Sequence, residues 1–208
     1  MRARQLLFSL VVAAAGVVAL HGEARATDPR FPDWPCNQLK VPELSVAAVW
    51  SGPPIDDVGS AWEDDPAVRD LVARIAARRT SLEDAQAAIA HFISGSEAER
   101  QQKARLVFAG LFKTLDHERD QVMEGIERYT RKQKEFADQI RSNALALHQL
   151  QDQPQRDQDK IDAMTEQLEW DTRIFDERRK TIGFVCEVPV RIEQRLFALA
   201  RAIQQALD

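Results

Sequence analysis

The longest regular pattern in this chain of 208 residues is a heptad repeat that starts at Phe108 and ends at Leu150. Residues at alternating steps of four and three between these positions are mostly apolar or aromatic, and no proline interrupts them. This spacing keeps one face of a helix apolar over many turns, which is typical of a coiled coil and unusual for a globular helix. The repeat therefore predicts one long helix.

A second repeat with the same spacing runs from Ile161 to Ile203. Between the two repeats lies a polar stretch whose Pro154 cannot continue a helix. Two repeats of matching length around a short break predict a long antiparallel coiled-coil helical hairpin over residues 97–207, with its tip near 151–156.

Single residues predict two further details of this hairpin. Gly183 and Pro189 predict a kink or a break in the returning arm, because neither residue favours a helix interior. If the arms pair about the tip, Arg119 falls next to Glu193. Two interpretations of Arg119 remain: it forms an ion pair that sets the register, or it lies along the apolar seam with its charge in water.

Cap signals divide the chain before the long hairpin. Asp65 is a typical cap for a first helix that ends near Arg79, and the pattern Thr80–Glu83 is a capping box for a second helix. Gly95 suits the left-handed position after that helix. These signals predict a short hairpin over 66–94. It would cover the wide apolar face at one end of the long hairpin, so the expected fold is all-α with a small four-helix base under a two-helix stalk.

The segment 27–59 contains six prolines, which exclude a long helix there. Unlike a polar linker, it also carries many apolar residues, among them Trp34 and Trp50. We therefore expect an extended proline-rich N-terminal strap that packs along the helices of the domain 60–208, with one helical turn at Ser45–Val49.

Residues 1–26 have the pattern of a signal peptide. Arg2 and Arg4 precede an apolar run from Leu6 to Leu20, and small residues follow with the spacing that signal peptidase needs. The alternative is an uncleaved anchor, but the run is shorter than the roughly 20 residues that span a bilayer. We predict cleavage after Ala26, export to the periplasm, and no stable membrane span afterwards.

The chain has two cysteines, Cys36 and Cys186, and export places them in an oxidising compartment. One structural disulfide between them is the simplest prediction. The alternative is two unpaired thiols, one of which bonds another chain. The motifs of redox-active cysteines and of covalent haem attachment are missing from the sequence.

The charge pattern and the motif search argue against several function classes. The formal net charge is −5, and acidic and basic residues are interleaved, so the basic stripe of a nucleic-acid-binding protein is missing. The sequence shows no nucleophile elbow, phosphate-binding glycine loop or di-iron motif. His117 lies beside three acidic residues, but neighbours in a helix do not share a face, so a solvated charged surface explains them better than a metal site. We predict no enzyme, no metal and no cofactor.

Three residues near the tip are candidate partner contacts. Leu145 and Trp170 occupy outward heptad positions, and Ile174 flanks the seam. Exposed tryptophan is a common anchor of protein interfaces. The alternatives are that the tip folds over these residues or that a dimer partner covers them.

Two resemblances follow from short motifs. The stretch from Trp34 to Ser45, which reads W-P-C-x-Q-x-K-V-P-E-L-S, resembles the opening of a group of small uncharacterised exported proteobacterial proteins, and this implies export. The tip is similar to that of periplasmic adaptor subunits of efflux and secretion systems, whose pattern is Arg-x3-Leu-x6-Ser. Arg141 and Leu145 fit this pattern, whereas Asp152 stands in place of the serine.

The sequence therefore predicts an exported, non-enzymatic coiled-coil interaction or scaffold protein of the periplasm. It would bind a protein partner, or associate with itself, through the stalk. The main alternative is a periplasmic holdase-like chaperone, which the hairpin shape alone suggests. An adaptor-like hairpin and a metal-binding protein have less support.

Overall fold

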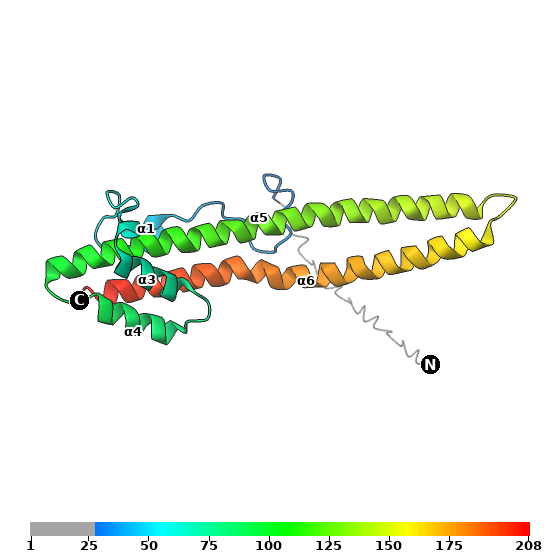
Figure 1. The fold of residues 1–208 in the computed structure, drawn as a ribbon. Coiled ribbons are helices and arrows are strands. Elements are labelled where there is room, and N and C mark those ends of the chain that lie inside the picture. Colours follow the sequence, from blue (N-terminus) through cyan, green and yellow to red (C-terminus); the bar gives the residue numbers. More distant parts are fainter. Residues whose placement is uncertain (1–27) are drawn as a thin grey trace, which may run out of the picture.

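The computed structural model of the protein describes residues 28–208. These residues form six α-helices and no β-strand (Figure 1), so the expected all-α class is confirmed. The predicted signal peptide, residues 1–26, lies outside the described residues.

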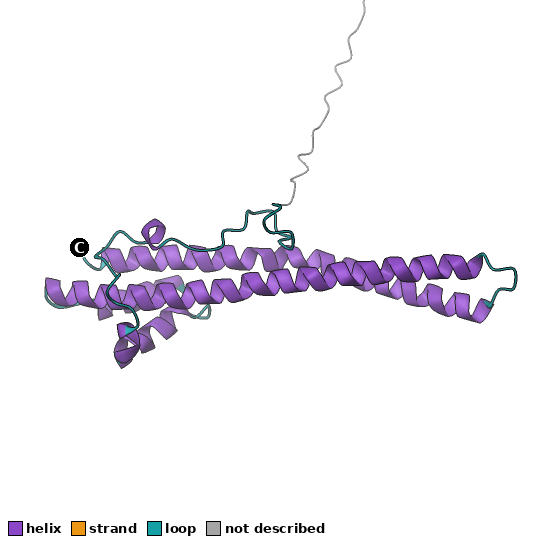
Figure 2. Ribbon diagram, turned by 90° about the horizontal axis from the view of Figure 1, so that it is seen from above, coloured by secondary structure: helices purple, strands orange, loops and turns teal. Residues whose placement is uncertain are grey.

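Two long helices dominate the structure, α5 (Glu97–Gln151) and α6 (Gln158–Gln205). They pack against each other, and Figure 2 shows them side by side in a second view. A capping box starts α5: the Ser96 hydroxyl accepts from the Glu99 amide, and the Glu99 carboxylate accepts from the Ser96 amide at 2.8 Å. The short turn between the helices contains Pro154, as the sequence predicts.

The predicted break in α6 is wrong, because the helix continues through Gly183 and Pro189. A proline in a helix interior costs about 3 kcal/mol, since it cannot bond the carbonyl of Val185. Burial of the Pro189 ring offsets part of this cost. The carbonyl of Cys186, the next residue after Val185, accepts a hydrogen bond from the side chain of Gln38 in the strap.

Two shorter helices, α3 (Pro66–Ala76) and α4 (Leu82–Phe92), lie at one end of the long pair. Asp65 caps α3 by accepting from the amide of Ala67 at 2.9 Å. This helix ends three residues before the expected Arg79.

The cap of α4 is Ser81, not Thr80, because the Thr80 hydroxyl donates a hydrogen bond to the carbonyl of Arg74 at 2.7 Å. A short helix that the sequence did not predict, α2 (Ala61–Asp64), precedes α3.

The main core lies where these helices meet. Helix α3 packs on α5, and α4 packs on α6, so four helices surround the core at this end. Phe197 of α6 lies outside this core and is exposed. The side chains with no exposed surface include Val68, Ile75, Ile89, Val107, Phe108, Leu111, Leu196, Leu199 and Ile203.

The strap, residues 28–59, runs along the two long helices (Figure 1) and contains the expected helical turn α1 (Val46–Val49). Both of its tryptophans are buried. Trp50 stacks on Phe108 with ring centroids 4.2 Å apart, and Trp34 packs on Met123 and Ile126. Each indole N–H donates to a strap carbonyl at 2.8 Å. Burial of one such side chain stabilises a fold by about 2–3 kcal/mol, so the strap is part of the packed structure.

Candidate functional site

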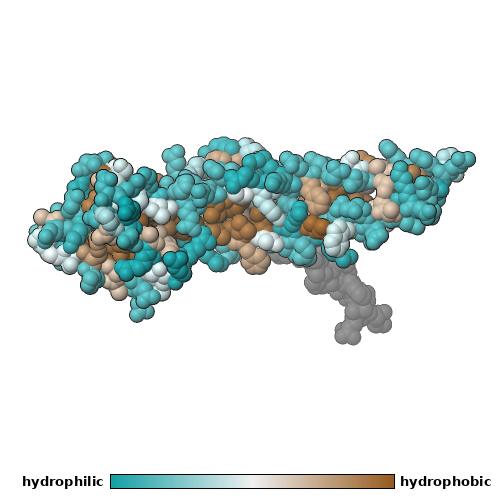
Figure 3. Space-filling model, viewed as in Figure 1, coloured by the Kyte–Doolittle hydropathy of each residue, from teal (hydrophilic) through white to brown (hydrophobic). Residues whose placement is uncertain are grey.

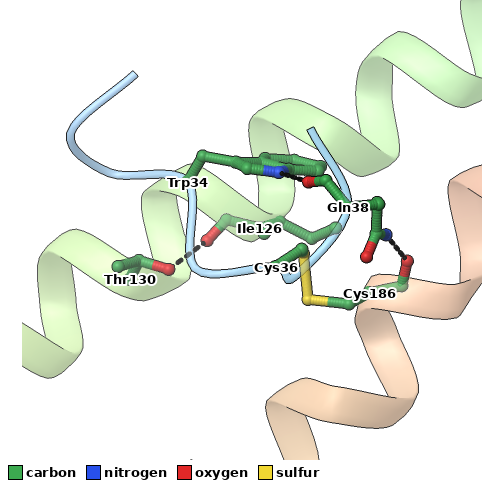
Figure 4. Close-up of a disulfide and its surroundings, with 6 residues drawn as sticks. All are labelled: Trp34, Cys36, Gln38, Ile126, Thr130 and Cys186. Atoms are coloured by element: carbon green, nitrogen blue, oxygen red, sulfur yellow. Dashed lines mark hydrogen bonds between the residues drawn. A yellow bond between two sulfur atoms is a disulfide. The ribbon is translucent and has the colours of Figure 1, made fainter. Parts of the chain in front are cut away.

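The strap is held to α6 by the two cysteines. Cys36 and Cys186 lie at bonding distance, with their Cα atoms 5.5 Å apart, so the pairing expected from the sequence is present (Figure 4). The Trp34 indole lies beside the disulfide and above Ile126 of α5. Strap, α5 and α6 therefore meet at one place, which we call the strap junction.

Ion pairs extend the strap junction along α5. The Lys40 ammonium donates to Glu127 at 2.7 Å, and Asp33 accepts from Lys134 at 2.8 Å and from Arg131 at 3.2 Å. The hydrogen bonds from Lys134, and then from Arg131, lower the pKa of Asp33 below its usual value. The carboxylate therefore stays charged well into the acidic range and keeps its contacts with α5.

Arg119 of α5 is the polar centre of the strap junction, and its side chain is 1 % exposed. Its Nε donates to Glu193 of α6 at 2.5 Å, and its Nη2 donates to the carbonyl of Val41 in the strap. The interpretation of Arg119 as an ion-pair partner of Glu193 is therefore confirmed, and the alternative with its charge in water is wrong. One guanidinium ties together three segments that are distant in sequence.

Two buried polar atoms near Arg119 lack a hydrogen-bond partner among the described residues, its own Nη1 and Oδ1 of Asp116. Burial, and then the negative charge of Asp120, raise the pKa of Asp116 above its usual value. Beneath the strap, a cavity of about 210 Å³ is lined by Trp34, Met123 and Pro189 among others. Arg119 also lines this cavity, so a water molecule there is the natural partner for its Nη1.

The chemistry of the strap junction is that of a structural site. Its charged side chains form ion pairs within the protein, Arg119 with Glu193 and Lys40 with Glu127 among them, and its sulfur atoms are paired with each other. Within residues 28–208, no three His, Cys, Asp or Glu side chains are placed to hold a metal ion. The Nε2 atoms of His117 and Gln121 lie 2.9 Å apart.

Beyond the strap junction, the two long helices form what we call the outer stalk, residues 128–185. From 128 to 146 and from 162 to 185 no side chain is fully buried. Phe136 and Phe175 meet across the two helices with ring centroids 6.5 Å apart and stay half-exposed. Figure 3 shows apolar patches among polar side chains along this part of the molecule. A narrow seam holds the outer stalk together.

The structure brings together two of the three predicted contact residues. Trp170 is 56 % exposed, and Ile174, one helical turn further along the same side of α6, is half-buried. Leu145 is 60 % exposed on α5. It lies two residues from the seam positions Asn143 and Leu147, so it points away from α6.

Sequence reasoning missed Phe184, which is 75 % exposed on α6. The heptad spacing assigns Val185 to the seam, but the strap binds the next residue, Cys186, and Val185 is exposed. One signal could have found Phe184: it lies two heptads after Trp170 and so occupies the same side of the helix. Steps of four and three connect these residues into one line, which we call the outer stripe: Trp170, Ile174, Glu177, Thr181, Phe184 and Val188.

The outer stripe begins at the base. Val188 packs against the main core and lines a groove of about 390 Å³ with Leu82, Leu115 and Ile192. The stripe then continues along α6 toward the tip, past the end of α4. The base covers its first residue, whereas Phe184 and Trp170 are open to solvent.

None of the helices between residues 28 and 208 combines the length and the apolar character that crossing a bilayer requires. No protein-family model matches this chain, and no curated protein or solved structure is significantly similar to it.

Proposed function

We propose that the protein is an exported, non-enzymatic interaction or scaffold protein of the periplasm. Its two long helices form an antiparallel coiled-coil hairpin that presents a protein-binding face on the outer stalk. The observation that carries this proposal is the outer stripe, where Trp170 and Phe184 stand in solvent on a helix that is already packed on α5.

The contacts between the long helices support the hairpin. Three cross-helix pairs, Arg119 with Glu193, Phe136 with Phe175, and Leu150 with Ile161, have residue numbers that add to 311 or 312. A constant sum is the mark of two helices that run in opposite directions in one register. The pairs extend from near the base to the tip, so the same register serves the whole length.

The disulfide and the N-terminal sequence support export. Structural disulfides form and persist in oxidising compartments, and Cys36 pairs with Cys186 at the strap junction. The first 26 residues have the charge, length and small-residue pattern of a signal peptide.

The exposed aromatic residues favour protein binding as the role of the outer stalk. Tryptophan buries a large area on binding and often dominates the energy of an interface. Trp170 is flanked by charged residues, Glu166 and Arg173 among them, so an apolar centre with a polar rim is already in place.

A photo-crosslinking amino acid at position 170, in cells that export the protein, tests this proposal. We expect a discrete adduct with a protein from position 170. The same amino acid at Thr172, which is exposed but lies on the opposite side of α6, is the matched control and should give none. Equal labelling at both positions, or none at either, contradicts the proposal.

One observation favours the holdase-like alternative. Exposed apolar side chains are spread along much of the molecule, from Leu82 at the base to Leu39 at the strap junction and Leu145 near the tip. A holdase would slow the aggregation of several unrelated unfolded proteins and give a smear of adducts. A specific scaffold would give one band and leave aggregation unchanged.

A further inference from the structure

We propose that the partner of the outer stalk is a second copy of this chain, whose α6 packs on α6 of the first in the opposite direction. This inference rests on the proposed function, because it names the partner of the same surface. Two patterns on α6, an exposed line that contains Trp170 and Ile174 and a line of charges beside it, point to the same pairing.

The first pattern is an exposed line that extends the outer stripe toward the tip. Steps of four and three lead back from Trp170 through Gln167, Ala163 and Lys160, and all four side chains are exposed. The residues of α6 that face α5, such as Leu168 and Phe175, lie about a quarter turn away around the helix. A second helix can therefore pack on this line without displacing α5, as neighbouring helices do in four-helix bundles.

The second pattern is a line of charges beside the first. Asp159, Glu166, Arg173 and Lys180 are spaced by seven residues, all are exposed, and the sign reverses at the midpoint. When two α6 helices run in opposite directions, Glu166 falls beside Arg173 of the second copy. A parallel arrangement would instead place like charges together. The line therefore selects antiparallel pairing with itself.

Both patterns require the same register. In this antiparallel pairing, the residue numbers of two facing stripe residues add to 337. Ala163 then faces Ile174 of the second copy, and Gln167 faces its Trp170. In that register Glu166 pairs with Arg173 and Asp159 pairs with Lys180, and the residue numbers of each pair add to 339. This sum is two higher than that of the facing stripe residues, which is the offset that coiled-coil geometry demands for flanking positions.

The same alignment joins Lys160 with Glu177 of the second copy. The three kinds of charge pair in this interface are thus all attractive, and each occurs twice because the arrangement is two-fold symmetric. Within the described chain, Glu166 and Arg173 form no ion pair of their own. Lys180 does bond Glu177 of its own chain at 2.8 Å, so its exposed ammonium would be shared.

The surface has the shape for such a contact. A hollow of about 430 Å³ on α6 is lined by Ala163, Glu166, Gln167, Glu169, Trp170 and Arg173. These residues surround the point on α6 where the two-fold axis between the two copies would pass. The indole of the second copy would enter the hollow beside Gln167, and each tryptophan would lose its exposure to water.

Light scattering and sedimentation of the purified protein over a range of concentrations test the pairing. We expect a reversible dimer. Glu166→Lys or Arg173→Glu alone creates two like-charge contacts per dimer and should weaken it about tenfold. The double variant should restore the parental affinity. Arg179→Glu, on the side of α6 away from the stripe, is the matched control and should leave the dimer unchanged.

Two further variants address the centre and the register. Trp170→Ala should weaken the dimer roughly a hundredfold, with helix content unchanged by circular dichroism. Ala163→Cys protein mixed with Ile174→Cys protein should form a cross-linked dimer on mild oxidation, whereas Ala163→Cys mixed with Thr181→Cys should not. Cross-linking of the second mixture and not of the first would disprove the register.

A protein that stays monomeric at every concentration, or a double charge variant as weak as the single ones, overturns the second-copy proposal. These failures are distinct from failure of the proposed function. A monomer whose position 170 still cross-links discretely to a different protein retains an interaction surface with another partner. A monomer that cross-links to nothing defeats both.

Discussion

Arg119 and Glu193 are joined across the two long helices, with Nε and Oε1 2.5 Å apart, where the arginine has almost no exposed surface. The same guanidinium bonds the carbonyl of Val41 in the strap. One side chain therefore contacts both the facing helix and the strap, so its substitution tests both contacts at once.

Arg119→Met should lower the free energy of unfolding by about 2–4 kcal/mol, because it leaves Glu193 and the carbonyl of Val41 without their partner. Urea denaturation measures this loss. Arg128→Met is the matched control: Arg128 is exposed and pairs with Glu124 at 3.4 Å, so its loss should cost about 0.5 kcal/mol or less. Similar values for the two variants would mean that the buried pair does not stabilise the fold.

Cys36→Ser and Trp34→Ala should each release the strap at its junction with α5 and α6. The first removes the covalent bond, and the second removes the packing on Met123 and Ile126 with the bond intact. We expect a lower melting temperature for both, and limited proteolysis within 28–59 before the long helices unfold. If all three proteins melt together and the strap is cut equally fast in each, the strap is a tether without a stabilising role.

Asp116→Asn should stabilise the protein at neutral pH. Burial raises the pKa of Asp116 in the folded state, so its protonated form is favoured there. Protonation of Asp116 therefore stabilises the folded state. This stabilisation is fully present below the unfolded-state pKa of 3.8 and is lost as the pH rises through the folded-state pKa. The variant should therefore melt higher than the parent at pH 7, and the difference should shrink below pH 3.8. A constant difference at both pH values would contradict this.

Gly95→Ala and Gly183→Ala should have opposite effects. Gly95 has a φ of +112°, and an added Cβ would lie 2.6 Å from the Glu99 carboxylate of the capping box. Alanine should cost about 1–2 kcal/mol there. Gly183 is inside α6 with open space around it, so alanine should stabilise by about 0.5–1 kcal/mol. Chemical denaturation of both variants checks the two signs, and a stabilising alanine at 95 would refute the strain argument.

The mature protein should begin at Thr27, because cleavage after Ala26 is predicted from the sequence. The intact mass of protein recovered from the periplasm measures this directly. A full-length mass in the membrane fraction would show that the N-terminal segment is retained as an anchor.

The elements that local chemistry determines were predictable from the sequence. The capping box at Ser96, the cap at Asp65 and the long seams each depend on residues within one or two helical turns, and the structure has them in place. The seam spacing even placed Arg119 next to Glu193, because pairing the two seams about the break at Pro154 determines which of their residues face each other.

What the sequence did not reveal depends on contacts between distant segments. Pro189 reads locally as a helix breaker, but the strap and α5 bury it and the helix continues. The fixed heptad step places Val185 in the seam, whereas the disulfide draws Cys186 inward and leaves Phe184 in solvent. Both errors arise at the strap junction, since packing by the strap cannot be read from the period of α6 alone.

The disulfide also determines how the molecule carries mechanical load. Cys36 and Cys186 are 150 residues apart, so the bond closes a covalent ring that contains the base hairpin, α5 and most of α6. Tension between residues 28 and 208 crosses this bond and bypasses the ring. Pulling on the two ends can therefore separate them by no more than the extended length of the residues outside the ring, roughly 110 Å, however hard the base is strained. A partner on the outer stalk would remain on helices that bear no force while the ends of the protein are under tension.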